Sequence, residues 1–240
     1  MATPTIREVV SAVATGGASA TVNTGAGTAV DDTLVCFAGN DWSTASGYGP
    51  PTGTAGTWTL KATGDNGSNT AHLKVYTRPV TVAGTQTVTV APSVDGEEAF
   101  NTTFVLVGAD LTDPSDGAAG GNGTTGTSSQ VAPAVSPSTA DALLLCGVQA
   151  DSTASSAAAY TPPAGMTEQS DLADGTFSAG STASLVLTAS GSTGTKTFTL
   201  APNATPYASA SIAVKGAAAA AGTPRPPVVP TAAVQRAATY

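Results

Sequence analysis

Two short stretches decide the fold: GTQTVTV at residues 84–90 and GTKTFTL at residues 194–200. In each, a glycine opens the segment, and from Thr87 and from Thr197 onward threonines alternate with apolar side chains. Strict alternation of polar and apolar residues is typical of a β-strand that has one face on a core. The two stretches begin 110 residues apart, at Gly84 and Gly194, and therefore predict equivalent strands in two copies of one unit.

Four further landmarks recur in the same order on either side of this pair. They are DTLVCF at 32–37 with DALLLC at 141–146, YGPP at 48–51 with YTPP at 160–163, LKVYT at 73–77 with LVLT at 185–188, and FVLVG at 104–108 with IAVKG at 212–216. The first match sets Asp32 beside Asp141. Five matches in one order predict an internal duplication, and self-similarity of this kind indicates the architecture before any single element does.

The segments themselves predict an all-β protein. Short strands are separated by clusters of Gly, Pro, Asn and Asp, and no segment has a convincing helical period, which favours two tandem antiparallel β-sandwich repeats of jelly-roll or immunoglobulin-like type. The continuous apolar runs that begin at Asp32 and Asp141 suit central strands covered on both faces. Aromatic residues make up only 5% of the chain, so we expect a thin core built from small side chains.

The composition also suggests boundaries. We expect a first repeat at 1–112, a flexible Gly/Ser/Thr-rich linker at 113–129, a second repeat at 130–216 and an extended Ala/Pro-rich C-terminal arm at 217–240. The linker favours two separate modules. The similar strand order would also allow the repeats to pack pseudo-symmetrically, in which case neither need be stable alone.

Charge and cysteine usage exclude several classes of function. The net charge is −8, and charged residues are only 10% of the chain. No basic stripe is visible, which argues against nucleic-acid binding and against an anionic membrane surface. The N-terminus lacks a signal peptide pattern and no apolar run reaches the length of a membrane span, so we expect synthesis in the cytoplasm. Cys36 and Cys146 lie in apolar runs and are expected to be free, buried thiols.

Residues for catalysis are sparse, and we expect neither an enzyme nor a cofactor. The single histidine, His72, lies in an alternating segment in which it and Lys74 are expected to face solvent. Glu97 and Glu98 follow a turn signal and are expected at a solvated hairpin tip. Together with Glu168 they give glycoside cleavage little support. Three carboxylates at Asp110, Asp113 and Asp116 motivate a calcium hypothesis, since Ca²⁺ prefers such oxygen ligands.

Aromatic side chains offer one candidate recognition site. Trp42, Tyr48 and Trp58 lie in or beside the turn-rich stretch at 40–57, and exposed loop aromatics are candidates for stacking on a glycan. The alternative is that these rings plug one end of the sandwich, because large rings usually serve burial.

The order of motifs resembles β-sandwich repeats of minor tail proteins and other virion proteins from phages that infect actinobacteria. The resemblance rests on the apolar run from Asp32, the segment at 50–59, and the strands at 73–76, 84–90 and 104–108, and it covers nearly the whole chain. It implies a non-catalytic virion component that is synthesised in the host cytoplasm and assembles with other virion proteins and with copies of itself. A capsid decoration protein is the closest alternative, followed by a glycan-binding host-adhesion module. The resemblance transfers no catalytic residue.

The C-terminal segment is expected to serve this assembly. It is rich in proline, and it also resembles the endings of proteins in that group. Such a segment buries itself poorly and is therefore expected to be disordered or to lie along a partner. The residues that we assign to this assembly arm are Pro224, Arg225, Pro226, Pro227, Arg236 and Tyr240.

Overall fold

The computed structural model describes residues 2–40, 48–66, 71–92, 97–123, 127–151, 159–175, 178–201 and 206–218. Within these ranges the chain forms sixteen strands and no helix. Consequently, none of the described segments is a helix that could cross a membrane. The predicted all-β class is confirmed.

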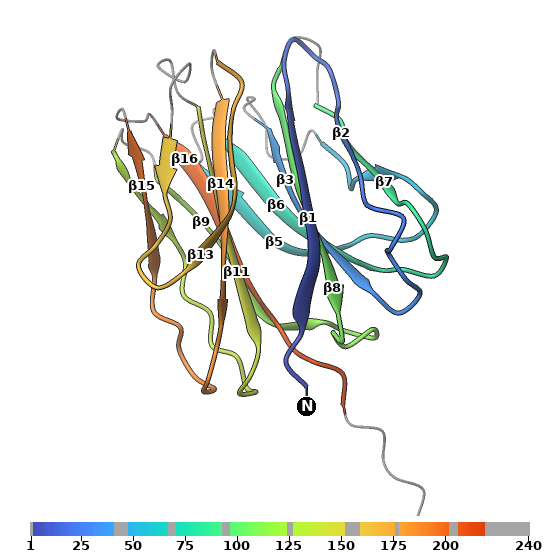
Figure 1. Cartoon of the computed structure of the whole chain (residues 1–240). Coiled ribbons are helices and arrows are strands. Elements are labelled where there is room, and N and C mark those ends of the chain that lie inside the picture. Colours follow the sequence, from blue (N-terminus) through green and yellow to red (C-terminus); the bar gives the residue numbers. More distant parts are fainter. Residues whose placement is uncertain are drawn as a thin grey trace, which may run out of the picture.

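The first repeat is a sandwich of two antiparallel sheets (Figure 1). Its five-stranded sheet has the order β1 (Thr5–Ala14), β8 (Ala99–Val107), β3 (Thr33–Asn40), β6 (His72–Pro79) and β5 (Thr59–Asp65). Its three-stranded sheet has the order β2 (Ala20–Asn23), β7 (Thr87–Val90) and β4 (Thr52–Gly53). Strand β1 pairs with β8, β2 with β7 and β3 with β6. This rolled-up pairing is that of a jelly roll, except that β5 extends the larger sheet.

The second repeat has the same topology. Its five-stranded sheet has the order β9 (Ser115–Gly123), β16 (Tyr207–Val214), β11 (Leu143–Asp151), β14 (Ser178–Val186) and β13 (Thr167–Ala173). Its three-stranded sheet has the order β10 (Ser129–Ala132), β15 (Lys196–Ala201) and β12 (Ala159–Thr161). The predicted duplication of the sandwich is therefore confirmed.

The strand registers correct two of the matches made from the sequence. The tight turn before each central strand has one non-glycine residue with positive φ, Asp31 (72°) and Asp141 (62°), so Asp31 and not Asp32 is the counterpart of Asp141. The second correction concerns the match between residues 73–77 and residues 185–188. Asn40 in β3 pairs with His72 at the start of β6, and its counterpart Ala150 in β11 pairs with Ala179 at the start of β14. The true counterpart of β6 is thus the whole of β14. Its buried positions are Ser, Ala, Gly and Thr, which explains why the apolar signal pointed to the end of that strand instead.

The segment expected to be a flexible linker is, over Ser115–Gly123, strand β9. It pairs with β16 along its length, and its backbone lies directly on β5. A Cβ atom on Gly120 would overlap the carbonyl group of Thr63, and one on Gly64 would lie 2.8 Å from the carbonyl oxygen of Gly121. Glycine within a strand marks such a close approach of two backbones. The composition that suggested a linker is thus the composition that this contact requires.

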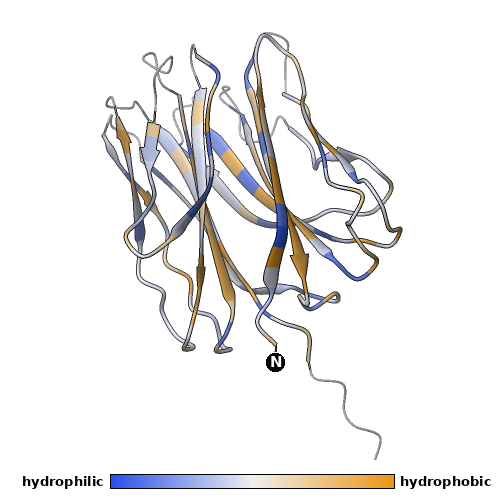
Figure 2. Ribbon diagram, in the orientation of Figure 1, coloured by the Kyte–Doolittle hydropathy of each residue, from blue (hydrophilic) through white to orange (hydrophobic). Residues whose placement is uncertain are grey.

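The four sheets stack in four layers, with the two five-stranded sheets face to face in the middle. Separate clusters of buried residues fill the first sandwich, the second sandwich and the space between the two larger sheets. In Figure 2 the ribbon colours show hydrophobic residues along strands of the two larger sheets, among them β8 and β11. Buried residues of β3 and β11 contribute both to the core of their own sandwich and to the core between the two larger sheets. This confirms the expectation that these strands are covered on both faces.

Strands β3 and β11 bring counterpart residues of the two repeats into contact, from which we infer a local pseudo-twofold axis between the repeats. Phe37 and Gly147 are counterparts under the duplication, and they contact each other: a Cβ atom on Gly147 would lie 2.6 Å from Cδ1 of Phe37. The next pair along the same faces, Gly39 and Gln149, likewise consists of counterparts in contact. At the axis, a large residue of one repeat therefore occupies the space left by a glycine of the other.

Candidate assembly surface

The structure places two of the three rings of the predicted aromatic platform, and both are largely covered by protein. Tyr48 is only 4% exposed, and its hydroxyl donates a hydrogen bond to the carbonyl oxygen of Ala38 at 3.0 Å. Trp58 is half-buried beneath the guanidinium of Arg78, whose carbon lies 4.9 Å from the ring centroid. Trp42 lies outside the described residues. A glycan contact through Tyr48 is therefore wrong, and the alternative, in which rings close the sandwich, describes Tyr48 and Trp58.

The prediction that His72 and Lys74 face solvent is also wrong. They are 0% and 8% exposed, because β6 lies between β3 and β5 in a sheet that is covered on both faces. Lys74 donates to the carbonyl oxygen of Tyr48 at 2.9 Å and lies over its ring at 4.1 Å, and burial lowers its pKa. His72 Nδ1 lies 3.3 Å from Asp65 Oδ1.

Arg78, on the same face of β6, binds the carbonyl oxygens of Thr54 and Ala55 and the side chain of Gln86. With Lys74 it fastens the segment at 48–58 to the sandwich. These buried cations thus serve to hold a loop in place.

The two cysteines are free and buried, as predicted. Burial raises the pKa of Cys36 to about 12 and that of Cys146 to about 11. A thiol acts as a nucleophile only as the thiolate, so neither is activated at neutral pH.

The carboxylates considered for calcium each have their own protein partners. Asp110 accepts hydrogen bonds from the backbone N–H groups of the turn that follows it, and Asp113 binds Lys61 Nζ at 2.8 Å. Partial burial alone would raise the pKa of Asp116, but hydrogen bonds from Thr139 and Ser138 outweigh it and lower this pKa to about 2. No three potential metal ligands gather within the described part of the chain.

Glu98 corrects one further expectation. It is buried rather than at a solvated hairpin tip, because it immediately precedes β8, which lies between β1 and β3 in the larger sheet. Glu98 therefore does not lie on an exposed surface with Glu97 and Glu168, the other two carboxylates considered for glycoside cleavage.

One surface feature stands out that the sequence reasoning missed. Among the described residues, every exposed large apolar side chain lies at one end of the molecule, which we call the arm end. These side chains are Val30, Leu60, Val82, Val107, Leu111 and Val186. They lie where β3 and β5 begin and where β6, β8 and β14 finish. Antiparallel pairing brings the strand ends of the first repeat together. The end of β14 lies beside β11 and β16, and the bridge between Gly216 and Ala109 joins that edge to the first repeat. The N-terminal end of the chain lies at the same end (Figure 1), and Ala217 is held there by its hydrogen bond to Gly108.

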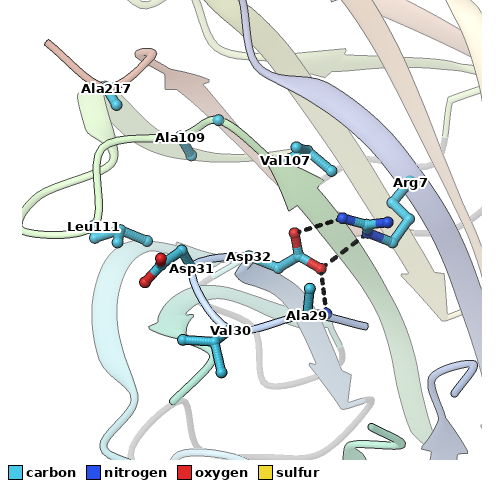
Figure 3. A pocket seen from close by; sticks show the side chains of 10 residues that line it. Arg7, Ala29, Val30, Asp31, Asp32, Val107, Ala109, Leu111 and Ala217 are labelled. Atoms are coloured by element: carbon cyan, nitrogen blue, oxygen red, sulfur yellow. Dashed lines mark hydrogen bonds and ion pairs between the residues drawn. The ribbon is translucent and has the colours of Figure 1, made fainter. Parts of the chain in front are cut away.

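The arm end contains an open groove of about 390 Å³. It is lined by Arg7, Ala29, Val30, Asp31, Asp32, Val107, Gly108, Ala109, Leu111 and Ala217 (Figure 3). A bidentate ion pair fixes its back wall: Arg7 Nε lies 2.9 Å from Asp32 Oδ2, and its Nη2 lies 3.1 Å from Oδ1. Asp32 also accepts the backbone N–H of Ala29 at 2.8 Å.

The adjacent carboxylate, Asp31, is exposed. The left-handed backbone conformation at this residue, which Asp tolerates better than most side chains, directs it away from the ion pair and toward the side of the groove formed by Leu111 (Figure 3). The groove therefore offers apolar walls with one exposed negative charge at the rim. Apolar residues placed within polar turns, such as Val30 and Leu111, are the sequence signal that could have indicated it.

The C-terminal arm begins at the wall of this groove. The N–H of Ala217 donates to the carbonyl oxygen of Gly108 at 2.8 Å, and Gly216 forms a β-bridge with Ala109. The residues assigned to the assembly arm, from Pro224 to Tyr240, lie outside the described residues.

Comparison with family models, with curated proteins and with solved structures gave no match to this chain.

Proposed function

We propose that the chain is a non-catalytic structural component of a phage virion, specifically a minor tail protein, that attaches to its neighbours through the arm end and the C-terminal arm. The observation that carries this proposal is the gathering of exposed apolar side chains at one end, beside the start of the proline-rich segment. Contiguous apolar surface on an otherwise polar protein marks interaction sites.

Two further features support the proposal. The strand order is that of a jelly roll, an architecture found in viral capsid and lectin domains, although a fold alone does not decide function. The nucleophilic candidates are also poorly placed for catalysis, since both thiols have raised pKa values and His72 is enclosed in the first sandwich.

The location of the chain in purified particles tests the proposal. Gold-labelled antibodies against the chain should decorate the tail. Labelling over the capsid would favour a decoration protein instead, and absence of the chain from purified particles would contradict any virion role.

Truncation tests the attachment mode. A chain that ends at Ala218 should keep its thermal unfolding midpoint but fail to enter particles. A matched variant, Thr197→Ala, changes one exposed side chain on β15, outside the arm end, and should enter particles normally. Normal incorporation of the truncated chain would contradict attachment through the arm.

A further inference from the structure

We propose that the groove at the arm end binds the proline-rich segment at residues 224–230 of a second copy of this chain. This inference rests on the proposed function, because it names the partner and the contact through which the arm end assembles. Three properties of the groove and of the segment support it.

The first property is apolar complementarity. The groove presents the partly exposed side chains of Val30, Val107 and Leu111 around the backbone of Gly108 and Ala109. Six of the seven residues at 224–230 are Pro or Val. Proline has a fixed φ and favours the extended polyproline conformation, so such a segment loses little conformational entropy when it docks in an apolar groove. A groove of about 390 Å³ lies within the usual size range of binding pockets.

The second property is charge. Residues 219–240 contain two arginines, Arg225 and Arg236, and no Asp or Glu. The remainder of the chain therefore holds all 16 acidic residues against 8 − 2 = 6 basic ones, a net charge of −10. Asp31 is exposed at the rim of the groove, and Arg225 lies inside the proline-rich segment. Complementary charges of this kind set the register and speed the encounter of two surfaces.

The third property is the place where the arm begins, which favours binding of the segment to the groove of a second copy over binding to the groove of its own chain. Ala217 already forms part of the wall, held by Gly108. To return into the same groove, the chain would have to reverse at once within residues 218–223, which are AAAAGT. Tight reversals rely on Gly, Pro, Asn and Asp, and here only Gly222 qualifies. Extended outward, the seven residue-to-residue steps from Ala217 to Pro224 span up to about 25 Å, enough to reach a neighbour.

Disulfide trapping between two full-length variants tests the contact. One variant carries Leu111→Cys in the groove and the other carries Val229→Cys in the arm. The native thiols are buried and do not compete. Under mild oxidation the mixture should form the disulfide-linked heterodimer at least tenfold faster than a control mixture in which Val186→Cys replaces the groove variant. Val186 is 50% exposed at the same end but lies outside the groove. Val107→Cys provides a second groove variant if Leu111→Cys folds poorly.

Charge provides a second readout. Adding Asp31→Asn to the groove variant should slow trapping about two- to fivefold, as expected for loss of one exposed ion pair. Equal trapping in the groove and control mixtures overturns the proposal. So does an intramolecular link in the double variant Leu111→Cys/Val229→Cys with no heterodimer in the mixture, since that result places the arm in its own groove. Because trapping uses purified protein, it is independent of particle incorporation, on which the proposed function depends.

Discussion

Replacing Phe37 by alanine should destabilise both repeats together, because its ring lies at the axis on which the two larger sheets meet. The side chain is fully buried and packs edge-to-face on Phe104 at a centroid distance of 5.9 Å. Truncating a buried Phe to Ala costs about 3–5 kcal/mol. For a chain of this size each kcal/mol lowers the melting temperature by about 2–4 °C, so we expect a decrease of about 6–20 °C.

The counterpart residue turns this into a test of contact between the repeats. The methyl group of Gly147→Ala would lie 2.6 Å from the ring of Phe37, and overpacking of this kind costs about 1–3 kcal/mol. In the Phe37→Ala background the same methyl group enters space that the ring has vacated. The double variant should therefore be more stable than the sum of the single effects predicts, by about 1–2 kcal/mol, within the range measured for residues in contact.

Urea unfolding followed by far-UV circular dichroism measures all four proteins of this cycle. A single transition is expected in each, because the central core is shared. Val82→Ala is the matched control: Val82 is 66% exposed, and its change should stay within about 0.5 kcal/mol. Additivity of the two substitutions within about 0.5 kcal/mol, or two separate transitions in the unsubstituted chain, would refute the face-to-face packing.

Three other predictions follow from buried contacts. Gly120→Ala should destabilise the fold by at least about 1 kcal/mol in urea unfolding, since its methyl group would meet the backbone of Thr63. Gly27→Ala, with open space around it, should have little effect, and equal effects would show that β9 does not lie on β5. Cys36 and Cys146 should not react with a thiol reagent at pH 8 until the chain is unfolded, and fast labelling of the native protein would contradict their burial. Stability should fall as the pH rises above about 9, by up to about 1.4 kcal/mol per pH unit for each thiol, because the unfolded chain releases these protons near pH 9 while the folded chain keeps them to pH 11 or 12. A urea midpoint that is unchanged between pH 8 and pH 10.5, or a Cys36→Ala/Cys146→Ala variant with the same decline, would contradict this reasoning.

The sandwich class and the duplication could be predicted because alternation of polar and apolar residues survives in the strands at 84–90 and 194–200. The central strands could be recognised from their continuous apolar runs. Strand β9 could not be recognised, because its glycines are needed for the close backbone contact with β5, and this contact depends on the whole fold. The orientation of His72 and Lys74 was missed for a related reason: alternation indicates two different faces, but only the layer arrangement shows that both faces of β6 are buried.

The assembly surface was harder to foresee. Proline content indicated that residues 224–230 are unsuited to a core, and this much is local information. The groove joins the start of β1, the turn at 29–32 and the connection at 107–111, which are far apart in the sequence. Only the antiparallel pairing of the strands brings them to one end.

The mismatched pairs at the pseudo-twofold axis have a consequence for exchange between molecules. Two first repeats brought together in the same way would place one Phe37 ring on another and leave a void between their Gly39 residues. Two second repeats would leave a void between their Gly147 residues and place one Gln149 side chain on another. Each half is thus a poor partner for its own kind and a good one for the other. The contacts at the axis therefore favour the pairing of a first repeat with a second repeat within one chain over the pairing of like repeats from two chains.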